Sequence, residues 1–245
     1  MIGKPYITLS TVDSTNNHAM RLIREGKAAQ GMVIFALEQT EGKGQRGRSW
    51  QSESGKNIMM STLIQGSRFS INEQFPLSAS IALACYDFFS KYAGDETRIK
   101  WPNDLYWRDR KAGGVLIENT VKEGKLEWIV AGTGININQV DFSAAMNAKA
   151  VSLKQITGKE FDPFQLSKEL LLCIEKRIDL LLANGAHQAI SAYNDLLYKK
   201  GEEAMFRKNQ IVYKAMVRQV NINGELEIEH GVQETIRHGE IEWVL

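Results

Sequence analysis

A short segment rich in glycine and cationic residues, set between two apolar runs, constrains the fold of this chain most. It reads Gly42-Lys43-Gly44-Gln45-Arg46-Gly47-Arg48-Ser49-Trp50, after the apolar run 32–37 and before the run 57–64. Glycines let a backbone turn tightly and approach a ligand closely. Lysine and arginine supply charge and hydrogen-bond donors for phosphate or carboxylate groups. We therefore expect an anion-binding loop that connects two strands.

The glycine spacing also satisfies the dinucleotide-binding pattern G-x-G-x-x-G, at Gly42, Gly44 and Gly47. That pattern requires a helix directly after the glycine turn and an acidic residue about 20 positions further on. Segment 48–55 has no apolar periodicity and ends in glycine, and Gln65-Gly66 closes the next strand. The P-loop pattern fails too, because no Gly-Lys-Ser/Thr follows. On this segment alone, a basic surface hairpin without a ligand remains an alternative.

The composition is that of an ordinary globular protein with a sizeable core. The chain has 245 residues, 43% of them hydrophobic and 24% charged, and a net charge of +1. A nearly neutral balance gives no global electrostatic case for binding nucleic acid or a membrane surface. The N-terminus lacks the apolar core of a signal peptide, and no run is long enough to span a bilayer. Cys85 and Cys173 lie in apolar stretches, so we expect buried, inert thiols in a reducing, cytoplasmic setting.

Periodicity predicts a large α/β part followed by a small all-β part. Capping residues at 13–16 and Gly26 delimit a first helix. Beyond Gly201, short alternating runs separated by turns predict a β unit of about 45 residues, a barrel packed on the main domain. The other expected elements are strands 32–37, 57–64 and 97–101, a hairpin of 113–121 and 126–130, and helices 77–92, 164–183 and 187–198.

Three further segments place polar groups and glycines at strand ends. They are Lys100-Trp101-Pro102-Asn103-Asp104, Lys111-Ala112-Gly113-Gly114-Val115-Leu116 and Gly132-Thr133-Gly134-Ile135-Asn136-Ile137-Asn138. Taken singly, each segment is weak evidence for a binding site, since Asp104 could be a turn former and Asn136 could be a capping residue. Together with the glycine loop they have the composition of a nucleotide-handling pocket.

These segments resemble, in order and spacing, those of the biotin protein ligases, also called biotin–[acetyl-CoA-carboxylase] ligases. Ser14-Thr15-Asn16, the loop 42–50 and segments 100–104, 111–116 and 132–136 carry the resemblance, which extends over nearly the whole chain. It implies a catalytic domain, residues 1–199, with a mixed β-sheet flanked by helices, like that of class II aminoacyl-tRNA synthetases and biotin ligases. A small SH3-like β-barrel, residues 200–245, would follow.

The resemblance also implies a two-step reaction without a covalent enzyme intermediate. Biotin reacts with ATP, assisted by Mg²⁺, to give biotinyl-5′-AMP and pyrophosphate, and a lysine of the biotin carboxyl carrier protein then takes the biotinyl group. Only about 13 residues precede Ser14, too few for a helix-turn-helix domain, so we expect no DNA binding. We expect no membrane association, and a homodimer remains an option. A lipoate–protein ligase and a non-catalytic module for an anion or RNA are the competing hypotheses.

Residue roles follow from the resemblance, position by position. Ser14, Thr15, Asn16 and Gln39 resemble biotin contacts, and Lys43, Gly44, Gln45 and Trp50 resemble loop positions over biotin and the adenylate. Lys111, beside Gly113 and Gly114, resembles the lysine that contacts the biotin carboxylate and the α-phosphate, and Asn136 the residue near the triphosphate and metal. Lys111, Asp104 and Lys43 are the candidate catalytic residues, with Asp104 the candidate acceptor of the carrier lysine's proton. No residue is assigned as a metal ligand.

The loop departs from the family pattern at two positions. Many relatives have arginine where this chain has Lys43 and Gln45, so the bidentate fork is lost at the first and the charge at the second. We expect Arg46 or Arg48 to supply part of the missing phosphate contact. We also expect the loop to be mobile when empty and to close over the adenylate, keeping water away from it.

Overall fold

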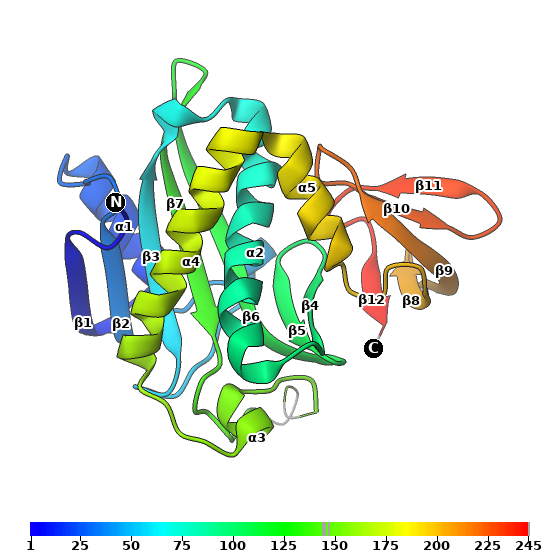
Figure 1. Cartoon of the computed structure of the whole chain (residues 1–245), viewed down its shortest axis with the longest axis horizontal. Helices are drawn as coiled ribbons and strands as arrows, with labels where there is room; N and C mark the ends of the chain where they lie inside the picture. Colours follow the sequence, from blue (N-terminus) through cyan, green and yellow to red (C-terminus); the bar gives the residue numbers. More distant parts are fainter. Residues whose placement is uncertain (144–145, 147, 245) are drawn as a thin grey trace.

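The computed structural model describes residues 1–143, 146 and 148–244, and its largest element is a seven-stranded sheet (Figure 1). The strand order is β1-β2-β3-β7-β6-β5-β4. Strands β1 and β2 are parallel and every other neighbouring pair is antiparallel, so the sheet is mixed, as the resemblance implied. The strands are β1 (Tyr6–Val12), β2 (Val33–Gln39), β3 (Ile58–Gln65), β4 (Thr97–Lys100), β5 (Asp104–Trp107), β6 (Arg110–Lys122) and β7 (Lys125–Ile135).

Helices cover both faces of this sheet. Along β2, Val33 and Phe35 face a core shared with α2 and α4, and Ile34 faces a second core shared with α1. This alternation follows from the two-residue period of a strand. Figure 1 shows α2 and α4 lying side by side across one face. The helices are α1 (Thr15–Arg24), α2 (Gln74–Ala93), α3 (Leu153–Thr157), α4 (Pro163–Asn184) and α5 (Ala186–Asp195), with 3₁₀ turns at Gln45–Gly47, Gly66–Arg68 and Ile71–Glu73.

Most of the expected elements are confirmed, but β1, β5 and α3 were missed. Strand β1 pairs on one side only and most of its residues are partly or fully exposed, so its sequence lacks an apolar run. Strand β5 has four residues and α3 has five, too few to show a period. Strands β6 and β7 extend the predicted hairpin at both ends.

The C-terminal strands form a separate antiparallel sheet, drawn in orange and red in Figure 1. Its order is β11-β10-β9-β8-β12, and a small SH3-like domain is consistent with it. Phe206 of this sheet shares a core with Tyr193 of α5, and the indole of Trp101 donates a hydrogen bond to the Gly224 carbonyl at 2.9 Å. The strands are β8 (Glu203–Lys208), β9 (Ile211–Val220), β10 (Leu226–Glu229), β11 (Gln233–Ile236) and β12 (Glu242–Val244).

Both cysteines are buried free thiols, as expected. Cys85 lies on α2 and Cys173 on α4, and burial raises the pKa of both thiols, which keeps them protonated and unreactive. In the described ranges, no helix is both long and apolar enough to cross a membrane.

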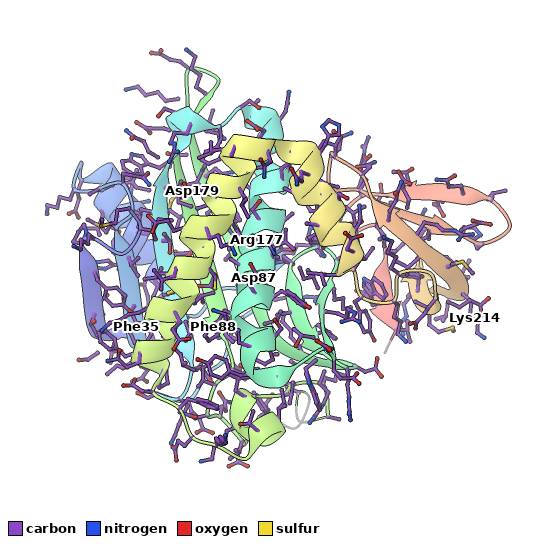
Figure 2. The ribbon with its side chains drawn as sticks, viewed as in Figure 1. Phe35, Asp87, Phe88, Arg177, Asp179 and Lys214 are labelled. Carbon is purple, nitrogen blue, oxygen red and sulfur yellow. The ribbon has the colours of Figure 1, made fainter. Side chains whose placement is uncertain are left out.

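A bidentate ion pair joins the two long helices. Arg177 of α4 donates from Nε to one oxygen of Asp87 on α2 at 2.6 Å, and from Nη2 to the other at 2.7 Å (Figure 2). Both side chains are about one-fifth to one-quarter exposed. Two parallel charge-assisted hydrogen bonds in this setting stabilise the packing of α2 on α4.

We predict that Asp87→Asn lowers the free energy of unfolding by about 1 to 2 kcal/mol, because the charge-assisted pair becomes a weaker, singly accepting contact. Urea unfolding measures the change. Asp179→Asn is the matched control, since this carboxylate is exposed on the same α4 helix. Equal losses in the two variants would contradict a role for the ion pair.

Lys100, at the end of β4, is a buried cation between the two sheets. Its Nζ lies 4.7 Å from the ring centre of Tyr106 and 5.4 Å from that of Trp243 on β12. It donates to the Tyr106 hydroxyl at 3.1 Å. Burial lowers the pKa of Lys100 from 10.5 to about 8; the Asp104 carboxylate opposes this shift, and nearby cations such as Lys111 add to it.

We predict that the free energy of unfolding of the wild type rises with pH between 8 and 10.5, relative to Lys100→Met. Over this range the unfolded chain holds the Lys100 proton more tightly than the folded chain does, so loss of the proton favours folding. Urea titrations at pH 7 and pH 10 should show the difference between the two proteins change by about 2 kcal/mol. Parallel pH dependence in both would refute the assignment.

Candidate functional site

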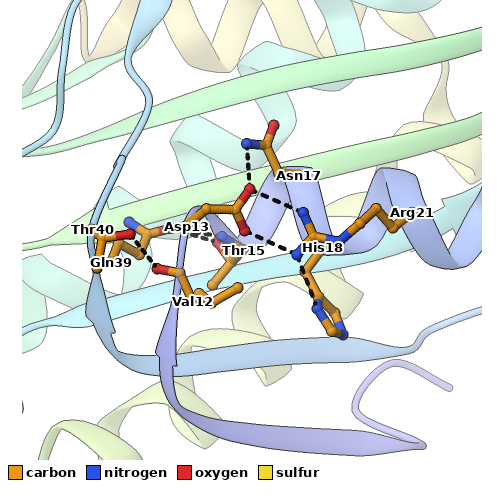
Figure 3. A network of polar contacts seen from close by, with 8 residues as sticks. All are labelled: Val12, Asp13, Thr15, Asn17, His18, Arg21, Gln39 and Thr40. Atoms are coloured by element: carbon orange, nitrogen blue, oxygen red, sulfur yellow. Dashed lines mark hydrogen bonds and ion pairs between the residues drawn. The ribbon is translucent and has the colours of Figure 1, made fainter.

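The first turn of α1 is fixed by a carboxylate that precedes it. Asp13 accepts two hydrogen bonds from Arg21, both 2.9 Å, and one from Asn17 at 2.8 Å (Figure 3). The Arg21 guanidinium holds the pKa of Asp13 well below its usual range. Asp13 and Arg21 are eight residues apart, about two helical turns, so this clamp sets where residues 14–16 lie.

Residues 14–16 join a buried polar cluster. The side-chain oxygen of Gln39, at the end of β2, accepts from the Thr15 amide at 2.8 Å and from its hydroxyl at 3.1 Å (Figure 3). From β3, the Ser61 hydroxyl lies 2.7 Å from Thr15 Oγ1 and 2.6 Å from Asn16 Oδ1. Ser14 is 2% exposed, and its side chain makes no capping hydrogen bond. Thr15, Asn16 and Gln39, three of the residues that resemble biotin contacts, therefore gather with Ser61 in one cluster of donors and acceptors.

Beside this cluster, two glycines of β7 leave the backbone of the strand uncovered by side chains of its own. Gly132 pairs with Ser61 on β3, and Gly134 pairs with Gly114 on β6, so all four positions share one face of the sheet. A Cβ on Gly132 would overlap the Asn16 side chain, and one on Gly134 would lie 2.8 Å from the Trp50 ring. The segment 132–136 therefore needs glycine where two side chains rest on bare backbone.

An ion pair lies further along the same face. Lys111 Nζ is 2.6 Å from Asp104 Oδ1, and each side chain is about one-quarter exposed. A Cβ on Gly114 would lie 3.0 Å from Asp104 Oδ1, so glycine there gives the pair its room. A Cβ on the neighbouring Gly113 would lie 2.8 Å from the Gly134 carbonyl oxygen. The structure thus brings together two of the three residues proposed for catalysis, and the third, Lys43, lies exposed on the glycine loop.

The glycine loop connects β2 to β3, as predicted, and folds back on itself. The Gly44 amide donates to the Arg48 carbonyl at 2.7 Å, and the Trp50 amide donates to the Gly42 carbonyl at 2.8 Å. Trp50 thereby returns to the sheet, where its ring centre lies 5.7 Å from Lys111 Nζ.

The cations of the loop lie at its exposed turn. Lys43, Arg46 and Arg48 are exposed, and Gln45 is half-buried. Arg46 has φ of 56°, the left-handed region that most residues avoid. Its guanidinium packs so closely on Gly239 of the C-terminal part that a Cβ there would overlap it. The loop is therefore bounded by the large sheet, through Trp50, and by the turn at Gly239, with three cations available to a polyanion.

Asn136 anchors the main chain behind Lys111. Its side-chain amide donates to the Val151 carbonyl at 3.1 Å and to the Lys111 carbonyl at 3.4 Å, and its backbone amide donates to Ala112 at 2.8 Å. The side chain is buried, and both donations go to protein carbonyls. In this geometry Asn136 positions the segment that carries Lys111.

Four parts of the site were missed by sequence reasoning: Ser61, Glu118, Lys100 and the Asp13–Arg21 pair. Ser61 and Glu118 lie in apolar or mixed strands with nothing in the local pattern to mark them, and their partners are about 45 and 100 residues away. Lys100 had been placed in a motif but given no role of its own. Within the described ranges no group of three or more His, Cys, Asp or Glu residues could hold a metal ion.

Comparison with known proteins gives a family match and several similar curated relatives. The Biotin/lipoate A/B protein ligase family matches residues 9–136, more than half of the chain. A bifunctional ligase/repressor BirA of Bacillus spizizenii is 31% identical over 187 residues, covering 76% of this chain and 57% of the relative. A biotin–[acetyl-CoA-carboxylase] ligase of Paracoccus denitrificans is 32% identical over 160 residues, covering 63% of this chain and 65% of the relative.

The fold matches over a greater length. The structure of a biotin protein ligase from Aquifex aeolicus in complex with biotin and ATP superposes with a TM-score of 0.81 and 26% identity. The match covers 98% of this chain and 99% of that one. It includes the C-terminal sheet, so both parts of the chain have a counterpart in one solved protein. The chain therefore belongs to the biotin/lipoate A/B protein ligase family.

Proposed function

We propose that this protein is a biotin–protein ligase, which activates biotin with ATP and transfers it to a lysine of a biotin carboxyl carrier protein. One observation carries the proposal: the Thr15–Gln39–Ser61 cluster and the Asp104–Lys111 ion pair lie on one face of the sheet, separated by bare glycine backbone. The amide and hydroxyl groups of the cluster suit a ureido ring, which both donates and accepts hydrogen bonds. The Aquifex relative, solved with biotin and ATP, supports the same assignment.

In the first step the biotin carboxylate would attack the α-phosphorus of ATP, and pyrophosphate would leave. Negative charge must then be neutralised on the α-phosphate and the leaving group. Lys111 lies beside the cluster and would serve the α-phosphate, after exchanging its contact with Asp104 for one with the substrate. Lys43, Arg46 and Arg48 would serve the outer phosphates from the loop, where Gln45 contributes no charge.

Mg²⁺ would enter with the triphosphate. This ion is commonly held by one or two carboxylates and by substrate phosphates rather than by a protein cage. In this site the substrate phosphates and water would hold the ion, and Asp104 stays free for the second step. When bound, the ion would neutralise part of the phosphate charge.

In the second step the carrier lysine must lose a proton before it attacks the adenylate. Deprotonating a free lysine of pKa ~10.4 at neutral pH costs about 4.6 kcal/mol. Asp104 would accept that proton, or hold the incoming ammonium, once Lys111 has turned to the phosphate. The resulting adenosine monophosphate then leaves as the amide bond forms.

A lipoate–protein ligase is the second candidate, because the matching family includes both activities. Lipoate carries an apolar dithiolane ring in place of the ureido ring. That ring offers no hydrogen-bond donor to the hydroxyl and amide groups of Thr15, Gln39 and Ser61, whereas a ureido ring both donates and accepts. The cluster therefore favours biotin.

We predict that biotin, and not lipoate, supports exchange of labelled pyrophosphate into ATP by the purified protein with Mg²⁺. Lipoate at the same concentration is the control substrate. Exchange that depends on lipoate alone would replace the proposed function with its alternative. Absence of exchange with both acids would reject an adenylating function.

We predict that Asp104→Asn slows transfer of biotin to a carrier domain by about 100-fold and leaves pyrophosphate exchange within about threefold, because only the second step needs its carboxylate as a base. Single-turnover transfer from purified biotinyl-5′-AMP measures the second step alone. Lys111→Ala provides the opposite pattern, with exchange lost and less effect on transfer from added adenylate. Equal losses of both steps in Asp104→Asn would overturn its role.

A further inference from the structure

Every polar edge of the Asn16 side chain is held by the protein. Its amide nitrogen donates to the Glu118 carboxylate at 2.7 Å and, at 3.4 Å, to the Leu116 carbonyl. Its oxygen lies 2.6 Å from the Ser61 hydroxyl, and the residue is only 3% exposed. Gly132 leaves just enough space for this side chain to lie on β7. Asn16 is thus fixed inside the polar cluster.

The carboxylate of Glu118 decides which way the Asn16 amide faces. A carboxylate only accepts hydrogen bonds, so the nitrogen edge must face Glu118 and the oxygen edge must face Ser61. With the amide turned over, two acceptors would meet at Glu118. The Leu116 carbonyl favours the same orientation, but at 3.4 Å it is the weaker of the two. Glu118 therefore imposes an orientation that Asn16 would not hold by itself.

This orientation extends to the residues proposed to contact biotin. Ser61 lies between Asn16 Oδ1 and Thr15 Oγ1, and Thr15 in turn contacts Gln39. The single Ser61 hydrogen goes to Asn16 Oδ1, which can only accept, so the Ser61 oxygen is left to accept from Thr15. If the Asn16 oxygen were turned away, the Ser61 hydrogen would turn to Thr15 Oγ1, and the Thr15 hydrogen would be left to Gln39 alone. A single acidic side chain on β6 thus determines the hydrogen-bond pattern of a cluster built from α1, β2 and β3.

We propose that Glu118 is a positioning residue for biotin: through Asn16 it fixes the Ser61 and Thr15 hydroxyls in the orientation that the ureido ring requires. This inference rests on the proposed function. On β7, Gly132 pairs with Ser61, which belongs to the biotin cluster. Two residues further along β7, Gly134 pairs with Gly114, which in turn pairs with Asp104. Two positions correspond to about 7 Å along a strand, so the effect should fall on biotin and spare ATP.

The test compares Glu118→Gln with the wild type in biotin-dependent pyrophosphate exchange and in calorimetric binding of biotin. The substituted amide can present either a donor or an acceptor, so it no longer fixes Asn16. We expect the KM and Kd for biotin to rise about tenfold, while the KM for ATP and kcat stay within twofold. Glu127→Gln is the matched control, since Glu127 lies on the neighbouring strand β7 with its carboxylate at an exposed contact with Thr120.

A reciprocal substitution separates positioning from general stability. Asn16→Asp alone places two carboxylates in contact and should weaken biotin binding more than Glu118→Gln does. In the double variant Asn16→Asp/Glu118→Gln the introduced amide can donate to the introduced carboxylate, whose other oxygen still accepts from Ser61. We expect biotin binding by the double variant to be tighter than by Asn16→Asp.

The outcomes are distinct. Unchanged biotin affinity in Glu118→Gln overturns the inference, and so does a parallel rise in the KM values for biotin and ATP with a lowered Tm, which would indicate a structural role alone. A double variant no better than Asn16→Asp overturns it too. Failure of the wild type to bind biotin would instead reject the proposed function.

Discussion

Side chains resting directly on bare backbone are the constraint on which this site depends. At Gly132 and Gly134 of β7 the sheet offers no side chain on the face toward α1, so Asn16 and Trp50 lie against the strand itself. These two residues come from opposite ends of the site, one from the first turn of a helix and the other from the end of the glycine loop. A methyl group at either glycine would push one of them away. Their separation is therefore set by two positions of one strand.

Buried polar groups need hydrogen-bond partners, and this need explains why the side chains of the site contact one another across several elements. A buried donor or acceptor without a partner costs about 1 to 3 kcal/mol, so each polar group brought into this interior requires another. Thr15 needs Gln39 and Ser61, Asn16 needs Ser61 and Glu118, and Asp104 needs Lys111. Each requirement crosses from one secondary-structure element to the next. The same contacts that would recognise a substrate also hold α1, β2, β3 and β6 together.

Local chemistry in the sequence was enough to find the glycine loop, its strand-to-strand connection and the Asp104 and Lys111 segments. Each of these depends on residues close together in the chain, such as glycines at short spacing or an aspartate after Trp-Pro. Ser61 and Glu118 could not be found in this way, because their importance comes from pairing register. Ser61 faces Asn16 only because β3 pairs with β7 so that Ser61 meets Gly132. Asn136 is the opposite case. The sequence motif identified its position in the site, but only the structure shows that its hydrogen bonds hold the main chain behind Lys111.

The contacts of Trp101 and Lys100 with the C-terminal sheet have a consequence for the order in which the protein is made. The Trp101 indole donates to the carbonyl of Gly224, and Lys100 lies against the ring of Trp243. Chains fold from the N-terminus during synthesis, and domains fold as units. When the segment that bears Asp104 leaves the ribosome, more than a hundred residues must still be added before its partners Gly224 and Trp243 exist. The polar face of the large sheet therefore emerges before its surroundings are complete, and the strands of the C-terminal sheet finish the burial of a segment next to the reacting groups.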